Sequence, residues 1–147
     1  MSVIRVTKEF HFEMAHALHG YNGPCKHIHG HSYCLRVCVI GPVNTDVADS
    51  CNGMVIDFSM LKAIVKTNVI DKWDHALLLN ARSSELVDGQ NEAFEKTIIV
   101  DYQPTCENML LDIVAKIQPH LPEGVKLHHL HLRETPTSYA EWFAGDN

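Results

Sequence analysis

Histidine is the residue type whose number and spacing most directly suggest chemistry in this sequence. The chain contains 11 histidines, and three of them occupy alternate positions between Cys25 and His31. Side chains two residues apart in extended backbone point to the same side, so His29 and His31 can converge on one ion. We expect His16, at the end of the preceding predicted strand, to be the third ligand. Imidazole nitrogens suit zinc better than magnesium or calcium, which prefer oxygen ligands.

Three interpretations of these histidines remain open from the residues alone. In a catalytic zinc site, His16, His29 and His31 would bind the ion and leave its fourth position free. In a structural site, Cys25 would be the fourth ligand and would close the coordination shell. Without a metal, the histidines would form ordinary hydrogen bonds in a surface loop. The length of 147 residues favours the catalytic site, because a chain of this size buries roughly 68–70% of its unfolded surface and needs no metal to fold.

Cys25 is the candidate reactive thiol. A neighbouring zinc ion and imidazoles would lower the pKa of such a thiol and raise its thiolate fraction at neutral pH. Pro24 and Lys26 place Cys25 in a polar loop, where an inert role is less natural. Cys34 and Cys38 lie in an apolar run and suit the inert role well.

Two acidic side chains are further candidates. Asp74 adjoins His75, and a carboxylate beside an imidazole can hold its tautomer and raise its basicity, although most such pairs are surface residues. Glu134 ends a predicted strand, and counting by twos puts it on the face of Leu130 and Leu132, at the edge of a buried surface. A carboxylate there can bind the amidine-like edge of a heterocycle through paired hydrogen bonds. A solvated strand end explains Glu134 equally well.

Alternating apolar residues predict the strands that carry these side chains. The first strand is expected over residues 4–14, and His16 continues its parity. Further strands are expected over 32–40, 97–102, 126–134 and 139–143.

Two amphipathic segments predict helices between these strands. Asp57 is an N-cap candidate for the first helix, and Pro104-Thr105 opens the second. The stretch 73–96 is expected to be a long connection. Two strands, two helices and then further strands predict one α+β domain over residues 1–147, with two helices on one face of an antiparallel sheet.

Composition argues against several classes of function. The formal net charge is −6 and no cluster of Lys and Arg is present, so a nucleic-acid partner is not expected. No apolar run approaches the length of a membrane span, and the first residues lack the pattern of a signal peptide. The five cysteines, an odd number, are then expected to be reduced thiols. We therefore expect a cytoplasmic protein that binds neither nucleic acid nor membrane.

Six short motifs that contain these candidates occur in order along most of the chain. They are Phe12–His16, Cys25–His31, Gly53–Phe58, Asp74–Leu78, Pro104–Asn108 and Arg133–Thr135. Together they resemble the tetrahydropterin synthase family, which comprises the 6-pyruvoyltetrahydropterin and 6-carboxytetrahydropterin synthases. The connection from Ala81 to Asp101 departs from the resemblance, because it is longer than in compact bacterial members.

The resemblance implies a tunnelling fold (T-fold), in which subunits join their sheets into a trimeric barrel and two trimers stack into a hexamer. It also implies 7,8-dihydroneopterin triphosphate as the substrate and active sites that lie between subunits. Cys25 would abstract a proton and Glu134 would anchor the pterin ring. The full set of implied site residues is His16, His29 and His31 for zinc, Cys25, Asp74 and His75 for catalysis, and Glu134, Thr105 and Glu107 for the substrate.

Spacing within the cysteine–histidine motif favours one branch of this family. Three residues separate Cys25 from His29, which resembles the carboxy-forming branch used in queuosine and deazapurine biosynthesis. That branch yields 6-carboxy-5,6,7,8-tetrahydropterin with loss of triphosphate and acetaldehyde. The pyruvoyl branch of tetrahydrobiopterin synthesis, which typically has a longer gap, is the alternative. A non-catalytic, zinc-stabilised binding module is the alternative from another class.

Overall fold

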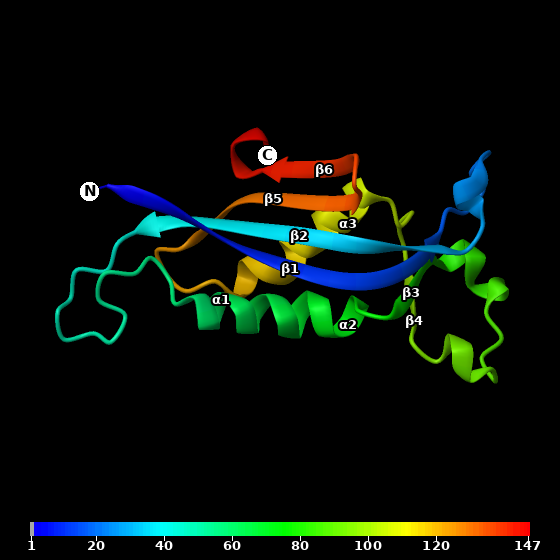
Figure 1. Ribbon diagram of the computed structural model, residues 1–147, viewed down its shortest axis with the longest axis horizontal. Coiled ribbons are helices and arrows are strands. Elements are labelled where there is room, and N and C mark those ends of the chain that lie inside the picture. Colours follow the sequence, from blue (N-terminus) through cyan, green and yellow to red (C-terminus); the bar gives the residue numbers. More distant parts are fainter. Residues whose placement is uncertain (1) are drawn as a thin grey trace.

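A curled sheet of six strands, in the order β4-β3-β1-β2-β5-β6, carries the long helices on one of its faces (Figure 1). The computed structural model describes residues 2–147. The strands are β1 (Val3–Ala17), β2 (His29–Pro42), β3 (Ala76–Asn80), β4 (Thr97–Val100), β5 (Lys126–Thr135) and β6 (Ser138–Phe143). The helices that cover the sheet are α1 (Phe58–Val65), α2 (Asp71–Trp73) and α3 (Cys106–Ile117), and a π-helical segment, Lys66–Ile70, joins α1 to α2.

The long antiparallel pair β1–β2 is the centre of the sheet. Its register runs from Val3 opposite Pro42 to His16 opposite His29. Phe10, Phe12 and Met14 of β1 are buried toward the helices, because alternate side chains of a strand share one face. His16 continues this buried row as predicted, and the strand register places His29 directly across from it.

Both main helices begin where the sequence predicted. The Asp57 side chain accepts a hydrogen bond from Ser59 N at 2.6 Å at the start of α1. The Thr105 side chain accepts one from Asn108 N at 3.3 Å at the start of α3. Side-chain caps of this kind satisfy backbone N–H groups that lack a partner within the helix. The helices then bury an apolar stripe against the sheet: Leu61, Val65, Met109, Leu110, Ile113 and Ile117.

The prediction of an antiparallel sheet with a long connection over 73–96 is corrected in one region. Ala76–Asn80 forms strand β3, which pairs in parallel with the end of β1, and β4 pairs in parallel with β3. The sheet is therefore mixed, and only β1, β2, β5 and β6 form its antiparallel part. Leu77, Leu78 and Leu79 are all buried, so β3 is covered on both faces and lacks the alternation that identified the other strands.

The antiparallel part of the sheet has an open edge on each side. Strand β3 covers only Met14–Ala17 of β1, so the outer edge of β1 from Val3 to Glu13 has no strand beside it within residues 2–147. Strand β6 is the last strand at the other end of the sheet. Over the same residues, no helix combines the length and apolar character needed to cross a membrane.

Candidate metal centre and active site

Three histidine rings converge at the end of the central strand pair. His16 is the next-to-last residue of β1, and His29 and His31 lie at the start of β2. Their nearest ligand atoms all lie within 4.8 Å of one another, and Nε2 of His16 is 3.1 Å from Nε2 of His29. Strand register and alternation thus bring together the three side chains that spacing had selected.

The rings of His16 and His29 are both oriented so that Nε2 is available to bind a metal. His16 Nδ1 lies 2.7 Å from the carbonyl oxygen of Pro104, and His29 Nδ1 lies 2.7 Å from that of His27. A carbonyl oxygen only accepts, so each Nδ1 must carry the proton and donate it. Each Nε2 then keeps its lone pair, which is the usual way in which a second partner orients a metal-binding imidazole.

The third ring supplies a buried nitrogen without a hydrogen bond. His31 Nε2 is inaccessible to solvent and forms no hydrogen bond with any of residues 2–147, and Glu134 Oε1 is 3.5 Å away. Burial lowers the pKa of both His16 and His31, so both rings favour the neutral form that binds metals. An orphaned buried nitrogen beside two oriented ones fits a bound metal ion at this position.

A second group of possible ligands lies on the helix-free face of the sheet. The ligand atoms of Glu9, His11 and Cys34 also lie within 4.8 Å of one another. The Glu9 carboxylate, however, is in contact with His11 Nε2 at 3.0 Å and Arg36 Nε at 2.7 Å, and the Arg36 hydrogen bond lowers its pKa. A guanidinium already bonded to the carboxylate repels a further cation, so this group is a satisfied polar cluster.

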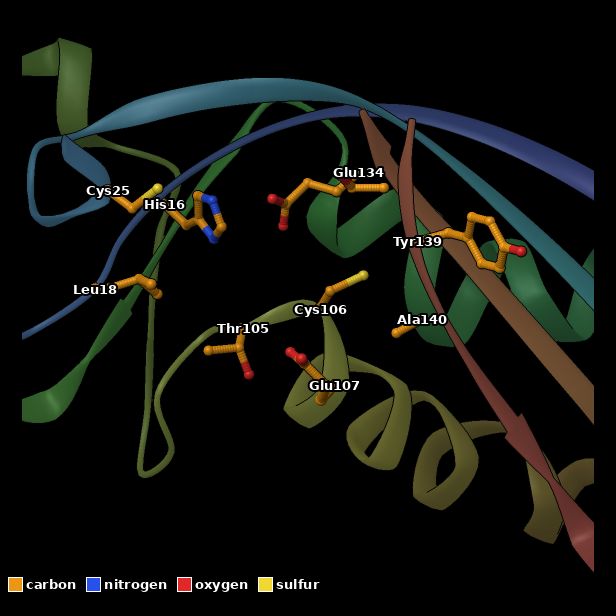
Figure 2. A pocket seen from close by; sticks show the side chains of 10 residues that line it. His16, Leu18, Cys25, Thr105, Cys106, Glu107, Glu134, Tyr139 and Ala140 are labelled. Carbon is orange, nitrogen blue, oxygen red and sulfur yellow. The ribbon is translucent and has the colours of Figure 1, made fainter. Parts of the chain in front are cut away.

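A cavity of about 230 Å³ adjoins the histidine cluster. Figure 2 shows the side chains of His16, Cys25 and Glu134 around it, together with those of Thr105 and Glu107 at the start of α3. Five of the nine residues named above as candidates from the sequence therefore line one cavity. Their segments are far apart in the sequence and meet because β1 and β5 end, and α3 begins, on the same side of the molecule.

Cys25 reaches this cavity from a short helical turn. It lies in η1 (Pro24–Lys26), between β1 and β2. Its carbonyl oxygen accepts a hydrogen bond from Leu18 N at 2.9 Å, which closes the loop back onto the end of β1. The thiol and His16 consequently face the same cavity (Figure 2).

Glu134 faces the cavity from the end of β5 on the predicted face of that strand. Its Oε2 accepts a hydrogen bond from the Tyr33 hydroxyl at 3.4 Å. Burial and the nearby carboxylate raise the pKa of Tyr33, so the phenol stays protonated and able to donate. The carboxylate is thus placed between a buried donor and the histidine cluster, with room in the cavity for a ligand.

Cys106 is a cavity residue that the predicted site did not include. Its thiol donates to the carbonyl oxygen of Leu132 at 3.2 Å. Burial, followed by the charge of Glu134, raises its pKa to about 12, so it stays protonated near neutral pH. Its position directly after Thr105, in the first turn of α3, is the only signal in the sequence that could have placed it here.

Asp74 and His75 do not line this cavity. They lie where α2 leads into β3. Asp74 Oδ1 accepts a hydrogen bond from Glu13 N at 2.9 Å and lies 3.1 Å from His75 Nδ1. The Glu13 hydrogen bond lowers the pKa of Asp74. The His75 side chain is 75% exposed and its backbone has φ of 61°, a conformation that is uncommon for a residue with a side chain. The single chain therefore does not bring the pair to Cys25.

The fold agrees with that of solved pterin synthases. The chain is similar to the 6-pyruvoyl tetrahydropterin synthase of Caenorhabditis elegans, with a TM-score of 0.70 and 22% identity over 98% of this chain and 97% of that one. This likeness defines the class of fold, the T-fold that the motifs predicted.

A family model described as 6-pyruvoyl tetrahydropterin synthase matches residues 5–144. The chain belongs to this family. It is 36% identical to the 6-carboxy-5,6,7,8-tetrahydropterin synthase of Haemophilus influenzae, over 95% of this chain and 99% of the relative. It is 31% identical to the protein of the same name from Rickettsia bellii, again over 95% and 99% of the two chains.

Proposed function

We propose that this protein is a zinc-dependent 6-carboxy-5,6,7,8-tetrahydropterin synthase. It would convert 7,8-dihydroneopterin triphosphate to 6-carboxy-5,6,7,8-tetrahydropterin with loss of triphosphate and acetaldehyde, as in the biosynthesis of queuosine and related deazapurines. The observation that carries this proposal is the convergence of three imidazoles beside a cavity that also holds a thiol and a carboxylate. The names of the similar proteins and the three-residue gap between Cys25 and His29 support the carboxy branch.

Glu134 would bind the pterin ring. A carboxylate can accept two parallel hydrogen bonds from the amidine-like edge of the heterocycle, and Tyr33 supports the Glu134 carboxylate from behind. Thr105 and Glu107 lie on the same cavity wall and would contact the ring from the start of α3. The ring bound in this way would point its side chain toward the histidine cluster.

His16, His29 and His31 would hold the zinc ion, which when bound would supply Lewis acidity to the hydroxyl oxygens of the substrate side chain. Cys25 as a thiolate would take the proton from the adjacent carbon, as a general base. His75, oriented by Asp74, would exchange protons with the reacting groups. Burial keeps Cys106 protonated, so Cys25 is the better candidate for this base.

The overall reaction needs no external oxidant or reductant. Two electrons move from the substrate side chain to the pterin ring while triphosphate is eliminated, which leaves a dicarbonyl side chain. Cleavage of its carbon–carbon bond consumes one water, giving a carboxyl group on the ring and acetaldehyde. The protein would therefore contribute binding, proton transfer and the metal site only.

The test is incubation of the zinc-loaded protein with 7,8-dihydroneopterin triphosphate. We expect acetaldehyde and triphosphate to form in equal amounts, together with a carboxylated tetrahydropterin identified by mass spectrometry. Triphosphate without acetaldehyde would instead assign the pyruvoyl branch. Binding of the substrate with neither product would rule out both enzymatic assignments.

The protein would act as a trimer or a hexamer formed by trimers. The open outer edge of β1 and the edge strand β6 offer unpaired backbone groups at both ends of the antiparallel sheet, and such edges favour pairing between chains. Exposed Val3 and Ile4 on β1 and Tyr139 and Phe143 on β6 would be covered by this pairing. The exposed Asp74–His75 pair would then complete the site of a neighbouring subunit.

A mixture of two inactive variants tests this sharing of sites. Cys25→Ala and His75→Ala, refolded together in equal amounts, are expected to recover about one quarter of the wild-type activity, because that fraction of randomly assembled sites takes an intact residue from each subunit. Cys25→Ala mixed with His29→Ala is the control: Cys25 and the histidine cluster that contains His29 would come from the same subunit in each site, so no recovery is expected. Equal failure of both mixtures would mean that each site uses residues of a single chain.

The protein would reside in the cytoplasm as a single functional domain. All five cysteines are free thiols, and such chains are typical of reducing compartments. A dihydropterin triphosphate is a small-molecule substrate, and neither a nucleic acid nor a membrane is expected as a partner.

A further inference from the structure

The side-chain amide of Gln103 is bonded to both backbone groups of His19, a residue 84 positions earlier in the chain. Gln103 Oε1 accepts from His19 N at 3.0 Å, and Gln103 Nε2 donates to the carbonyl oxygen of His19 at 2.8 Å. The carbonyl oxygen of Gln103 accepts from Thr105 N at 2.7 Å and from Asn108 Nδ2 at 3.0 Å. The side chain is therefore fixed to the segment after β1, and the backbone is fixed to the start of α3.

The residue after this clamp carries the carbonyl group that orients a candidate metal ligand. Pro104 O accepts the hydrogen bond from His16 Nδ1 at 2.7 Å. Three hydrogen bonds thus join the segment of His16 and His19 to the segment of Gln103 and Pro104. The proline ring restricts φ of Pro104, and the hydrogen bond from Thr105 N to the Gln103 carbonyl closes a three-residue turn around Pro104. Little freedom therefore remains between the clamp and the Pro104 carbonyl, and the clamp helps to set where that carbonyl points.

His19 is itself anchored on its other side. Its Nδ1 lies 2.8 Å from the hydroxyl of Ser83, and Ser83 is buried. The preceding residue, Leu18, donates its backbone N–H to the carbonyl oxygen of Cys25. The backbone to which Gln103 binds is therefore a fixed point, shared with the loop that carries the candidate thiol.

We infer that Gln103 is a positioning residue for the metal centre. Its amide holds the Pro104 carbonyl against His16, which keeps the proton on Nδ1 and directs the lone pair of Nε2 toward the ion. It also holds Thr105 and the start of α3 against the end of β1, on either side of the cavity. This inference rests on the metal site of the proposed function, but the orientation of His16 can be measured without a metal.

The test compares Gln103→Met with wild type. Methionine has a similar length and cannot form either hydrogen bond to His19. Competition with a chelator of known zinc affinity is expected to give a zinc dissociation constant roughly 10–100-fold higher, the usual effect of losing a group that orients a ligand. In metal-free protein, nitrogen NMR of the histidine rings is expected to show His16 protonated at Nδ1 in the wild type and a mixture of tautomers in the variant.

Gln90→Met is the matched control, because Gln90 is an exposed glutamine in the segment before β4, and it should leave both measurements unchanged. If Gln103→Met does not fold, Gln103→Asn, which keeps the amide on a side chain too short to span both contacts, is expected to shift both readouts in the same direction. Unchanged zinc affinity and an unchanged His16 tautomer in the folded variant would overturn the inference. Failure of the wild type to bind zinc would overturn the proposed metal site, and the NMR comparison would still decide the role of Gln103.

Discussion

Replacement of Cys25 by alanine is expected to lower turnover by roughly 10²–10⁴-fold, the usual contribution of a general base, while zinc remains bound. The Cys25 thiol lines the cavity beside His16. Its sulfur is not part of the group of ligand atoms, from His16, His29 and His31, that lie within 4.8 Å of one another. Steady-state production of acetaldehyde and triphosphate, together with the zinc content of the purified variant, measures both parts of this prediction.

Two further cysteine variants sharpen the result. Cys51→Ala, in the loop between β2 and α1 that lines a different cavity, should keep full activity and serves as the control for loss of a thiol. If Cys25→Ala lost its zinc with little change in residual turnover, the thiol would be a ligand and the assigned role would be wrong. If Cys106→Ser and not Cys25→Ala caused the large loss, the base would have to be Cys106 despite its raised pKa.

Removal of the metal is expected to abolish turnover and leave the protein folded. The buried core consists mainly of apolar side chains from the central strands and the two main helices, including Phe12, Leu35, Leu61, Ile113 and Leu130. The histidine cluster lies at one end of the sheet, beyond most of this core. The core therefore does not depend on the ion for its formation, in contrast to small modules that unfold when a chelator removes zinc.

Circular dichroism and thermal unfolding, with and without a chelator, measure this second prediction. The melting temperature should fall, because a bound ion at 100 times its dissociation constant stabilises the folded state by about 2.7 kcal/mol. The folded spectrum should persist at 25 °C, and added zinc should restore turnover. Unfolding at that temperature on chelation would favour the non-catalytic, zinc-stabilised module over the enzyme.

A single-residue variant distinguishes the effect of losing the ion from any other effect of the chelator. His29→Ala removes one of the three convergent nitrogens, and its zinc affinity should fall by more than the roughly 10–100-fold that follows the loss of an orienting partner. Its turnover should fall with its zinc content. His128→Ala, a histidine on β5 whose ring is bonded to Arg5, should bind zinc as the wild type does.

The local pattern of the sequence determined the parts of the site that depend on nearest neighbours along the chain. Alternation over residues 4–16 predicted which side of β1 is buried, and His16 lies on that side. The two-residue spacing of His29 and His31 placed both rings on one face of β2. The cap candidate Asp57 and the Pro104-Thr105 pair predicted where the two helices begin. These features follow from the periods of strands and helices, which act over a few residues.

Tertiary structure alone decided the contacts between distant segments. Strand β3 is buried on both faces and shows no alternation, so its parallel pairing with β1 is visible only in the folded chain. The hydrogen bond from His16 to the Pro104 carbonyl joins residues 88 positions apart, and Cys106 enters the cavity because α3 packs on β5 and β6.

Asp74 and His75 lie outside the cavity that holds Cys25, which no spacing in the sequence could reveal. Packing of whole elements against one another sets these distances, and no short-range pattern records it.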